Sequence, residues 1–410
     1  MKKYLFILMA AGCLAVACEK KGEVLSPDDQ KAAIEEAAVQ AVQAVDLDNW
    51  KGTVDLITSS MAVMGATEPD DSMREWEESM EGAWRVENSG KDYPVDVIDL
   101  TKVKGEFSVV EGKLLRTNTT SGLSLIWHLD DENNTACKAT ATVKNSSQKV
   151  LIDEDADYEY DNSGNVTKET ITYQEWLIVP SLVDVKLTSG KKTEARVKLT
   201  TDLNIAGDEP RPTDKMSATA DITFSGYNLC ISRAKYSTSN IELKADFKKG
   251  STSIFSTTFS AKGKLAFEDD DDIDEMASDG KVNVSATLMG TVGLKGTLDW
   301  TACKKVFEAD QKVEHTTEES LTAYATGLEK AVNVAVYVDD TAQARLGFEP
   351  VWEDADHWHL YTVIRFEDGS AYEMAEEFFS PNNYGRVIEA VNTLLAKITD
   401  YFNPEEEHVQ

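Results

Sequence analysis

The fold class is decided by residues 282–300, which read VNVSATLMGTVGLKGTLDW. From Val282 to Trp300 every even position is apolar or glycine, whereas most odd positions are polar. A period of two marks a β-strand with one buried face and one wet face. Because strands are usually about five or six residues long, we expect Met289-Gly290 to divide this run as a turn or a bulge.

The same alternation recurs upstream and is punctuated by turn signals. It is clear in the segments 195–199, 218–224 and 241–247, while turn residues occur at 162–164, 189–190 and 249–250, and a longer loop is expected over 204–215. We therefore expect roughly ten to twelve antiparallel strands between Lys104 and Lys304. Strands and helices do not alternate there, which disfavours a parallel βαβ sheet.

Both ends of the chain have helical periodicity instead. Ser26 is placed as an N-cap, with Pro27 at the first helical position, and Ala-rich apolar spacing of three and four follows. Further helices are expected after Asp48 and from Ser72 to Trp84. Residues 26–86 thus form a helical lead.

The C-terminal third is expected to contain helices around a β-hairpin. Thr316 and Glu319 form a capping box before a helix that reaches Val332. Strands are expected at 342–352, 357–366 and 372–379, with the hairpin turn at 368–369, and Pro381 opens a last helix that we expect to pack on the hairpin.

These patterns together predict an α+β fold that is mostly antiparallel β, with one or more large amphipathic sheets and packed helices at the N- and C-terminal ends. The expected segments are a signal peptide (1–17), a lipid-anchored tether (18–25), the helical lead (26–86), the β body (95–304), and a helix, β-hairpin and C-terminal helix packed on that body (316–404).

The N-terminus has the layout of a secretory signal. Lys2 and Lys3 precede a short apolar stretch that ends in Leu14-Ala15-Val16-Ala17-Cys18, which is similar to a bacterial lipobox. We expect lipid attachment at Cys18 and a membrane contact through acyl chains alone. The alternatives are a rival box ending at Cys13 and an ordinary signal peptide cut near Ala17.

Charge limits the partners. The chain has 41 Lys and Arg against 73 Asp and Glu, a formal net charge of −32. A polyanion would be repelled, so nucleic acid is not an expected partner. The same charge leaves divalent cations as candidate ligands.

Histidine and aspartate side chains suggest two weak candidate metal sites. His357 and His359 are expected on the same face of a strand, and Asp270 and Asp272 belong to the acidic run 268–275. A metal site needs three or four converging ligands, which neither segment provides, and the acidic run lacks the glycine and final glutamate of an EF-hand. We therefore favour a polar strand edge and a solvated acidic loop, and we expect no metal and no cofactor.

The three remaining cysteines are widely spaced. Cys137, Cys230 and Cys303 form no metal knuckle and no CxxC pair. We favour three small buried side chains over the alternative of one disulfide and one thiol.

Two stretches support a resemblance to a known class of protein. One is Cys18 followed by Leu25-Ser26-Pro27-Asp28-Asp29-Gln30-Lys31 and an Ala-rich helix; the other is Phe366-Glu367-Asp368-Gly369-Ser370, followed by a strand, Ser380-Pro381 and an amphipathic helix. Together they resemble uncharacterised outer-membrane lipoproteins of Bacteroides-type bacteria. The resemblance implies an outer-membrane location, on the periplasmic or the cell-surface side, and brings no catalytic residues.

Three functions are compatible with these features. The chain lacks a G-x-S-x-G motif and a Gly-rich phosphate loop, so we expect a non-catalytic structural or binding role toward an envelope protein or a glycan. The second hypothesis is a periplasmic carrier of a lipid or other apolar ligand on the apolar sheet face, which carries the small residues Ala220, Ala245, Ala286, Gly290 and Gly296. The third is a hydrolase that uses dispersed carboxylates.

Overall fold

A computed structural model describes the fold. It describes residues 24–66, 71–87, 90–110, 113–129, 133–207, 214–264, 279–310, 317–352 and 358–402. The chain divides into two compact units: Met1–Asp48 with Tyr227–Gln410, and Asn49–Gly226. We call them unit 1 and unit 2.

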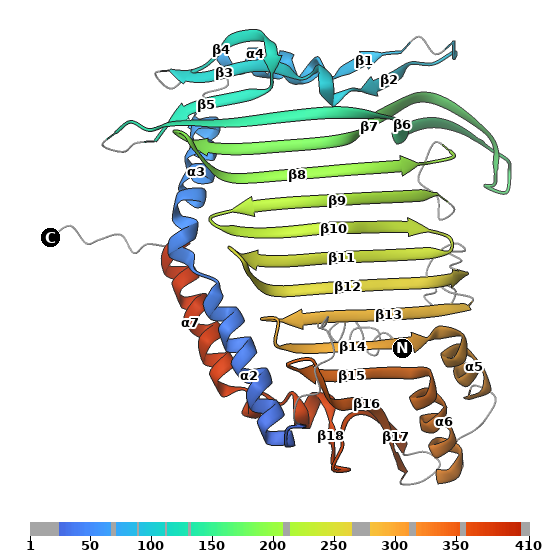
Figure 1. The fold of residues 1–410 in the computed structure, drawn as a ribbon. Helices are drawn as coiled ribbons and strands as arrows, with labels where there is room; N and C mark the ends of the chain where they lie inside the picture. The colour runs from blue at the N-terminus through green and yellow to red at the C-terminus, as the bar shows by residue number, and fades with distance from the viewer. Residues whose placement is uncertain are drawn as a thin grey trace. The chain divides into compact units, whose positions relative to one another are not determined.

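Unit 1 is built on an antiparallel meander in which each strand pairs with the next along the chain (Figure 1). Its strands are β10 (Tyr227–Ser237), β11 (Asn240–Lys249), β12 (Thr252–Lys264), β13 (Asp279–Leu288), β14 (Val292–Asp299), β15 (Val332–Val338), β16 (Thr341–Trp352), β17 (Trp358–Phe366) and β18 (Ala371–Glu373). Val284, Gly296 and Val334 lie opposite one another on neighbouring strands, so the alternation in the sequence becomes one continuous apolar face.

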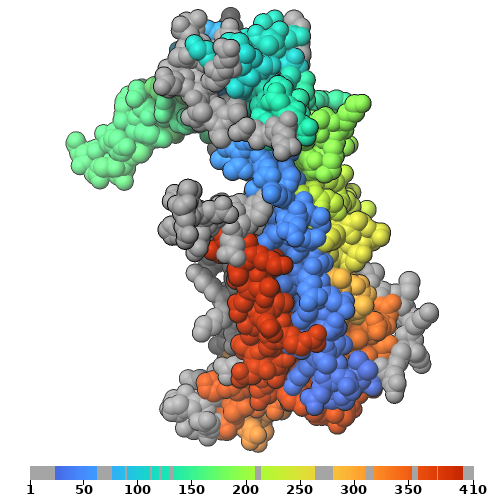
Figure 2. All heavy atoms as spheres, turned by 90° about the vertical axis from the view of Figure 1, so that its left-hand side faces the viewer, coloured from blue at the N-terminus to red at the C-terminus, as the bar shows by residue number. Residues whose placement is uncertain are grey.

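The helices of unit 1 are α2 (Pro27–Ala44), α5 (Trp300–Asp310), α6 (Glu318–Ala331) and α7 (Gly385–Phe402). Ser26 caps α2, since its Oγ accepts a hydrogen bond from the Asp29 N–H at 3.2 Å. α2 contacts strands β12 to β15, and α7 lies alongside α2 (Figure 2). The N-terminus of α7 is held by acidic side chains of α2: the Arg386 N–H donates to Glu35 at 2.9 Å, and the Arg386 guanidinium donates to Glu36 at 2.8 Å.

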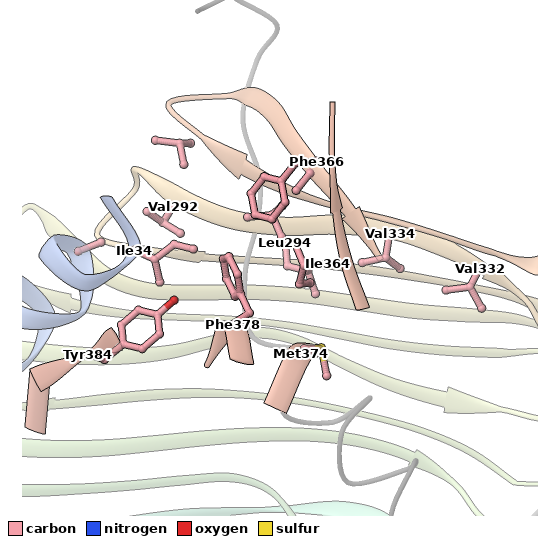
Figure 3. Close-up of a cluster of buried hydrophobic side chains, with 14 of the residues drawn as sticks. Ile34, Val292, Leu294, Val332, Val334, Ile364, Phe366, Met374, Phe378 and Tyr384 are labelled. Carbon is pink, nitrogen blue, oxygen red and sulfur yellow. The ribbon is translucent and has the colours of Figure 1, made fainter. Parts of the chain in front are cut away.

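The core of unit 1 lies on the apolar face of its sheet (Figure 3). Ile34 of α2 packs there with Phe378 and Tyr384, which follow β18, against Leu294 and Ile364 of the strands. Phe378 is 0 % exposed and Ile364 is 1 % exposed. α2 therefore covers part of the sheet as ordinary core.

Unit 2 contains two long strands, β6 (Ala136–Tyr160) and β7 (Val166–Ser189), that pair as one antiparallel hairpin. Its other strands are β1 (Trp84–Val86), β2 (Val95–Ile98), β3 (Lys104–Val110), β4 (Lys113–Gly122), β5 (Ser124–His128), β8 (Lys192–Asn204) and β9 (Lys215–Phe224). β2 pairs in parallel with β7, and β3 pairs in parallel with β5.

Two helices pack in unit 2. α3 (Leu47–Ala66) begins at the boundary between the units, and α4 (Asp71–Glu81) precedes β1. Leu56 of α3 is buried with Phe107, Leu114 and Trp127, and the Trp127 Nε1–H donates to Ser59 at 2.9 Å. In the portion of the chain with a described structure, no helix is long and apolar enough to cross a bilayer.

Much of the sequence-based reading is confirmed. The chain is mostly antiparallel β with helices at both ends, and twelve strands, β3 to β14, lie between Lys104 and Lys304 in the described residues. Met289-Gly290 is a turn in which both residues have positive φ, so the long alternating run is two strands. The turns at Gly164, Gly190 and Gly250 are also confirmed, each with positive φ at the glycine.

Several boundaries were wrong. Trp300 begins α5 and does not end a strand, because the Asp299 carboxylate accepts the Ala302 N–H and caps a helix. The N-cap of α6 is Thr317 and not Thr316, and Val332 starts β15, a strand that the sequence reading missed. Trp84 lies in β1 and not in a helix.

The last strand and the last helix also differ from expectation. β18 ends at Glu373, and Met374–Phe378 forms a π-helical turn. The final helix begins at Gly385, after a 3-10 turn at Pro381–Asn383, and it packs mainly against α2, whereas we expected it to pack on the hairpin. The apolar positions of α7 serve that contact in part, since Val387 and Leu394 are half-buried, whereas Leu395 is 53 % exposed.

Candidate functional site

The candidate site is a fork in the sheet of unit 1, where β15 separates from β16. These strands pair only between Ala335–Val338 and Thr341–Arg345. The first residues of β15 pair with β14 alone, and the end of α6 lies beside β16 instead. A cavity of about 580 Å³ occupies the fork, a volume within the range of small-molecule sites.

Glu329, in the last turn of α6, links that helix to β16 and β17 beside the fork. Its carboxylate accepts the backbone N–H of Phe348 at 3.1 Å and the Nε–H of Arg365 at 3.3 Å. The carboxylate therefore satisfies a β16 donor that no β15 carbonyl reaches. Gly347 permits this approach, because a Cβ there would lie 2.7 Å from Arg365 Nε and 3.1 Å from Glu329 Oε1.

The inner lining of the cavity is apolar. Val332, Val334, Ala344 and Phe366 are each less than 7 % exposed and belong to the hydrophobic core of the unit, and Leu346 is half-buried beside them. Figure 3 shows Val332 and Val334 on the apolar side of β15. An apolar group that enters the cavity would pack against these apolar side chains and would be removed from water.

The outer lining is charged and has a positive excess. The charged residues of the lining are Lys330, Arg345 and Arg365 against Glu329 and Glu367. Arg365 is engaged by Glu329 and by the Phe348 carbonyl, to which it donates at 3.2 Å. Among the residues with described side chains, Arg345 and Lys330 are exposed and form no ion pair. On a chain with net charge −32, this opening is a local exception that favours an anionic group.

A half-open apolar face lies further along the same sheet. Phe247, Phe255 and Phe259 share this face through the register of β11 and β12, and all three are half-buried. Leu243, on the same face, is 37 % exposed. A large apolar surface left partly exposed often marks a ligand or partner site.

Three of the five small residues expected on a ligand-binding apolar face have other roles. Ala286 is 0 % exposed in the core, and Gly290 lies in the turn between β13 and β14. A Cβ at Gly296 would lie 2.2 Å from the Asn333 carbonyl oxygen, so this glycine permits the close approach of β15.

The residues singled out from sequence are mostly not placed. Cys18, His357, Asp270 and Asp272 lie outside the described residues. His359 is exposed on β17, its ring centroid 5.8 Å from that of Tyr361. The described residues contain no group of three or more His, Cys, Asp or Glu side chains that could hold a metal ion.

Sequence reasoning did not find the cationic side chains at the fork. Arg345 and Arg365 lie on different strands and become neighbours only through the register of β16 with β17. No motif signals that pairing. The nearest local signal is the direct change from helix to strand between Ala331 and Val332.

Comparison of the chain with protein-family models, curated proteins and solved structures gives no match.

Proposed function

We propose that this chain is a lipid-anchored, non-catalytic binding protein of the cell envelope, and that it holds an amphiphile with an anionic group at the fork between β15 and β16. The observation that carries the proposal is the combination of an apolar inner lining with an exposed Arg345 that forms no ion pair within the described part of the chain. A site of this kind binds the apolar part by burial and orients it by a few polar groups.

The sequence supports the proposed lipid anchor and the proposed location at the outer membrane. The signal layout and the lipobox ending at Cys18 favour acylation and export, and the resemblance to outer-membrane lipoproteins favours that membrane. The half-open face with Phe247 and Phe255 favours the carrier form of this function, because it is a second, partly exposed apolar surface in the same unit.

Direct binding tests the proposal. The probe is a fluorescent long-chain fatty acid, titrated into residues 19–410. We expect saturable binding, and we expect a neutral alcohol of the same chain length to bind at least about tenfold more weakly, which corresponds to about 1.4 kcal/mol. Equal binding of the acid and the alcohol would contradict the role of the cationic opening.

Two variants localise the site. Arg345→Glu should weaken fatty-acid binding by about tenfold or more, and Asn333→Trp should block the opening, since Asn333 is an exposed lining residue. The matched control is Lys244→Glu, which makes the same charge change at an exposed position of β11. If Lys244→Glu weakens binding as much as Arg345→Glu does, the loss of affinity comes from the change in the overall charge of the protein, and the fork is not the site.

A second measurement addresses the natural ligand. Native mass spectrometry of residues 19–410 purified from the periplasm of the native host should show the mass of a bound amphiphile. A clean apo mass together with no fatty-acid binding would reject the carrier form of the function.

A further inference from the structure

The hairpin of β6 and β7 extends as an arm within unit 2 beyond the strands that flank its base (Figure 1). We define the arm as residues 152–170. Among the described residues, β5 pairs with β6 only at 136–140, β2 pairs with β7 only at 174–177, and β8 pairs with β7 only from Leu182. Both edges of the arm are therefore free of these strands.

The arm is exposed throughout, including its apolar side chains. Every residue from 152 to 170 is exposed except Ala156, which is half-buried. Tyr158 is 47 % exposed, Tyr160 is 61 % exposed and Val166 is 54 % exposed. Tyrosines are enriched at the energetic centres of protein interfaces because they are large, rigid and partly polar.

These apolar side chains share one face. Tyr160 lies opposite Val166, and Tyr158 lies two residues earlier on the same strand, so the ring centroids of the two tyrosines are 6.4 Å apart. The Tyr158 hydroxyl donates to Glu169 at 3.1 Å, directly across the ladder. The result is a tyrosine face with a carboxylate within it.

The arm is strongly acidic. It has seven carboxylates, at Asp153, Glu154, Asp155, Asp157, Glu159, Asp161 and Glu169, against one lysine. That lysine, Lys168, forms a 2.7 Å ion pair with Glu159 on the other face of the arm. No cation of the arm balances the carboxylates around the tyrosines.

The tip of the arm is ordered by its own hydrogen bonds. Asp161 accepts the backbone N–H groups of Ser163 and Asn165 at 2.7 and 2.9 Å, and Gly164 has φ +83°. These backbone hydrogen bonds, Asn165 first, lower the pKa of Asp161. The arm is therefore preorganised, which lowers the entropic cost of binding.

We propose that this arm is the docking site for a cationic, extended segment of a protein partner. Lysine and arginine side chains of the segment would pair with the carboxylates, and its apolar side chains would cover Tyr158 and Tyr160. The free strand edges would supply backbone hydrogen bonds, as in other β-strand additions.

A second copy of this chain is disfavoured as the occupant. Two arms meeting edge to edge would bring together fourteen carboxylates, twice the seven of one arm, and like charges opposed across strands are destabilising. Charged edge strands resist pairing with themselves for this reason. The same charges that exclude an acidic copy select a cationic segment.

The test uses a short fluorescent peptide of alternating lysine and valine, titrated into residues 19–410 by anisotropy. We expect saturable binding that weakens with added salt, and no binding of the matched peptide of alternating glutamate and valine. The double variant Tyr158→Ser with Tyr160→Ser should lose at least about tenfold in affinity. Both residues are exposed, so the fold should be retained, as circular dichroism would show.

The control variant is Tyr361→Ser, an exposed strand tyrosine of unit 1, which should bind as the original chain does. No binding of the lysine peptide, or equal binding by the double variant, would overturn the proposal. Sedimentation velocity provides a further check. Self-association that disappears in the double variant would assign the arm to a second copy and also overturn the proposal.

Discussion

The hydroxyl group of Tyr227 closes the C-terminus of α2 by donating to the carbonyl of Ala44 at 2.6 Å. The same oxygen accepts the backbone N–H of Asp46 at 2.7 Å. Tyr227 is 1 % exposed on β10, and its ring stacks on Phe247 with centroids 5.8 Å apart. One side chain thus satisfies two backbone groups at a helix end that has no capping glycine.

Replacing Tyr227 with phenylalanine should destabilise unit 1 by about 1–3 kcal/mol. The ring and its stacking remain, but two partly buried backbone groups lose their hydrogen-bond partner. Urea unfolding followed by circular dichroism measures the change. The control is Tyr361→Phe on β17, where the side chain is 39 % exposed. A similar loss in both variants would mean that the Tyr227 hydroxyl has no special role.

At Gly296 the backbone of β15 approaches β14 too closely to leave room for a side chain. A Cβ there would lie 2.2 Å from the Asn333 carbonyl oxygen and 2.5 Å from the Val334 Cα, both backbone atoms that cannot rotate away. Gly296→Ala should therefore cost about 1–3 kcal/mol or more, as in other overpacked cores. Hydrogen exchange of the β14 and β15 amides reports the loss directly.

Gly385→Ala provides the comparison. A Cβ at Gly385, the first residue of α7, would meet nothing within 4 Å. This substitution should leave stability unchanged or slightly raised. Unchanged protection of β14 and β15 in Gly296→Ala would contradict the close approach.

The sequence predicted the strands whose two faces differ in polarity. The alternation from Val282 to Leu298 gave both β13 and β14, and the turn chemistry of Met289-Gly290 gave their boundary. β15 was missed because Val334 and Ala335 point to opposite faces and are both buried, at 4 % and 7 % exposure. A strand buried on both faces reads as a continuous apolar run, which periodicity cannot separate from helix.

The fork could not be predicted from the sequence for a different reason. Glu329, Arg345 and Arg365 come from α6, β16 and β17, and their contact depends on where two strands stop pairing. The parallel pairings of β2 with β7 and of β3 with β5 are likewise long-range. Local pattern predicts the type of most elements, but it does not show which distant segments pair or where two strands stop pairing.

The three described cysteines are present as thiols, and their burial predicts an order of reactivity. Cys303 is 2 % exposed, and burial, with the nearby charge of Asp299 second, raises the pKa of its thiol to about 11. Cys137 is also buried, whereas Cys230 is half-exposed. In residues 19–410 at mildly alkaline pH, iodoacetamide should modify Cys230 first and leave Cys303 intact until the chain unfolds.

Peptide mass mapping measures this order. Labelling in denaturant serves as the control, since all three thiols should then react at similar rates. Early modification of Cys303 in the folded chain would contradict its burial, and a disulfide between any two of the three would contradict their thiol state.

The Asp184–Arg196 pair predicts a pH-dependent part of the stability of unit 2. The guanidinium donates to both carboxylate oxygens, at 2.8 and 2.6 Å, across β7 and β8. The hydrogen bond from Arg196, with burial opposing it, lowers the pKa of Asp184. The stabilisation is therefore present above the ordinary aspartate pKa of about 3.9 and is lost as the pH falls through the lower value in the folded chain.

Asp184→Asn should lower the urea-unfolding free energy of unit 2 by on the order of 1 kcal/mol at neutral pH, since the pair is two-pronged but partly exposed. The difference from the original chain should shrink as the pH falls below about 4. Asp202→Asn, at an exposed position of β8, controls for the loss of one negative charge. A difference that persists unchanged at low pH would show that Asp184 stabilises the sheet through packing and not through its charge.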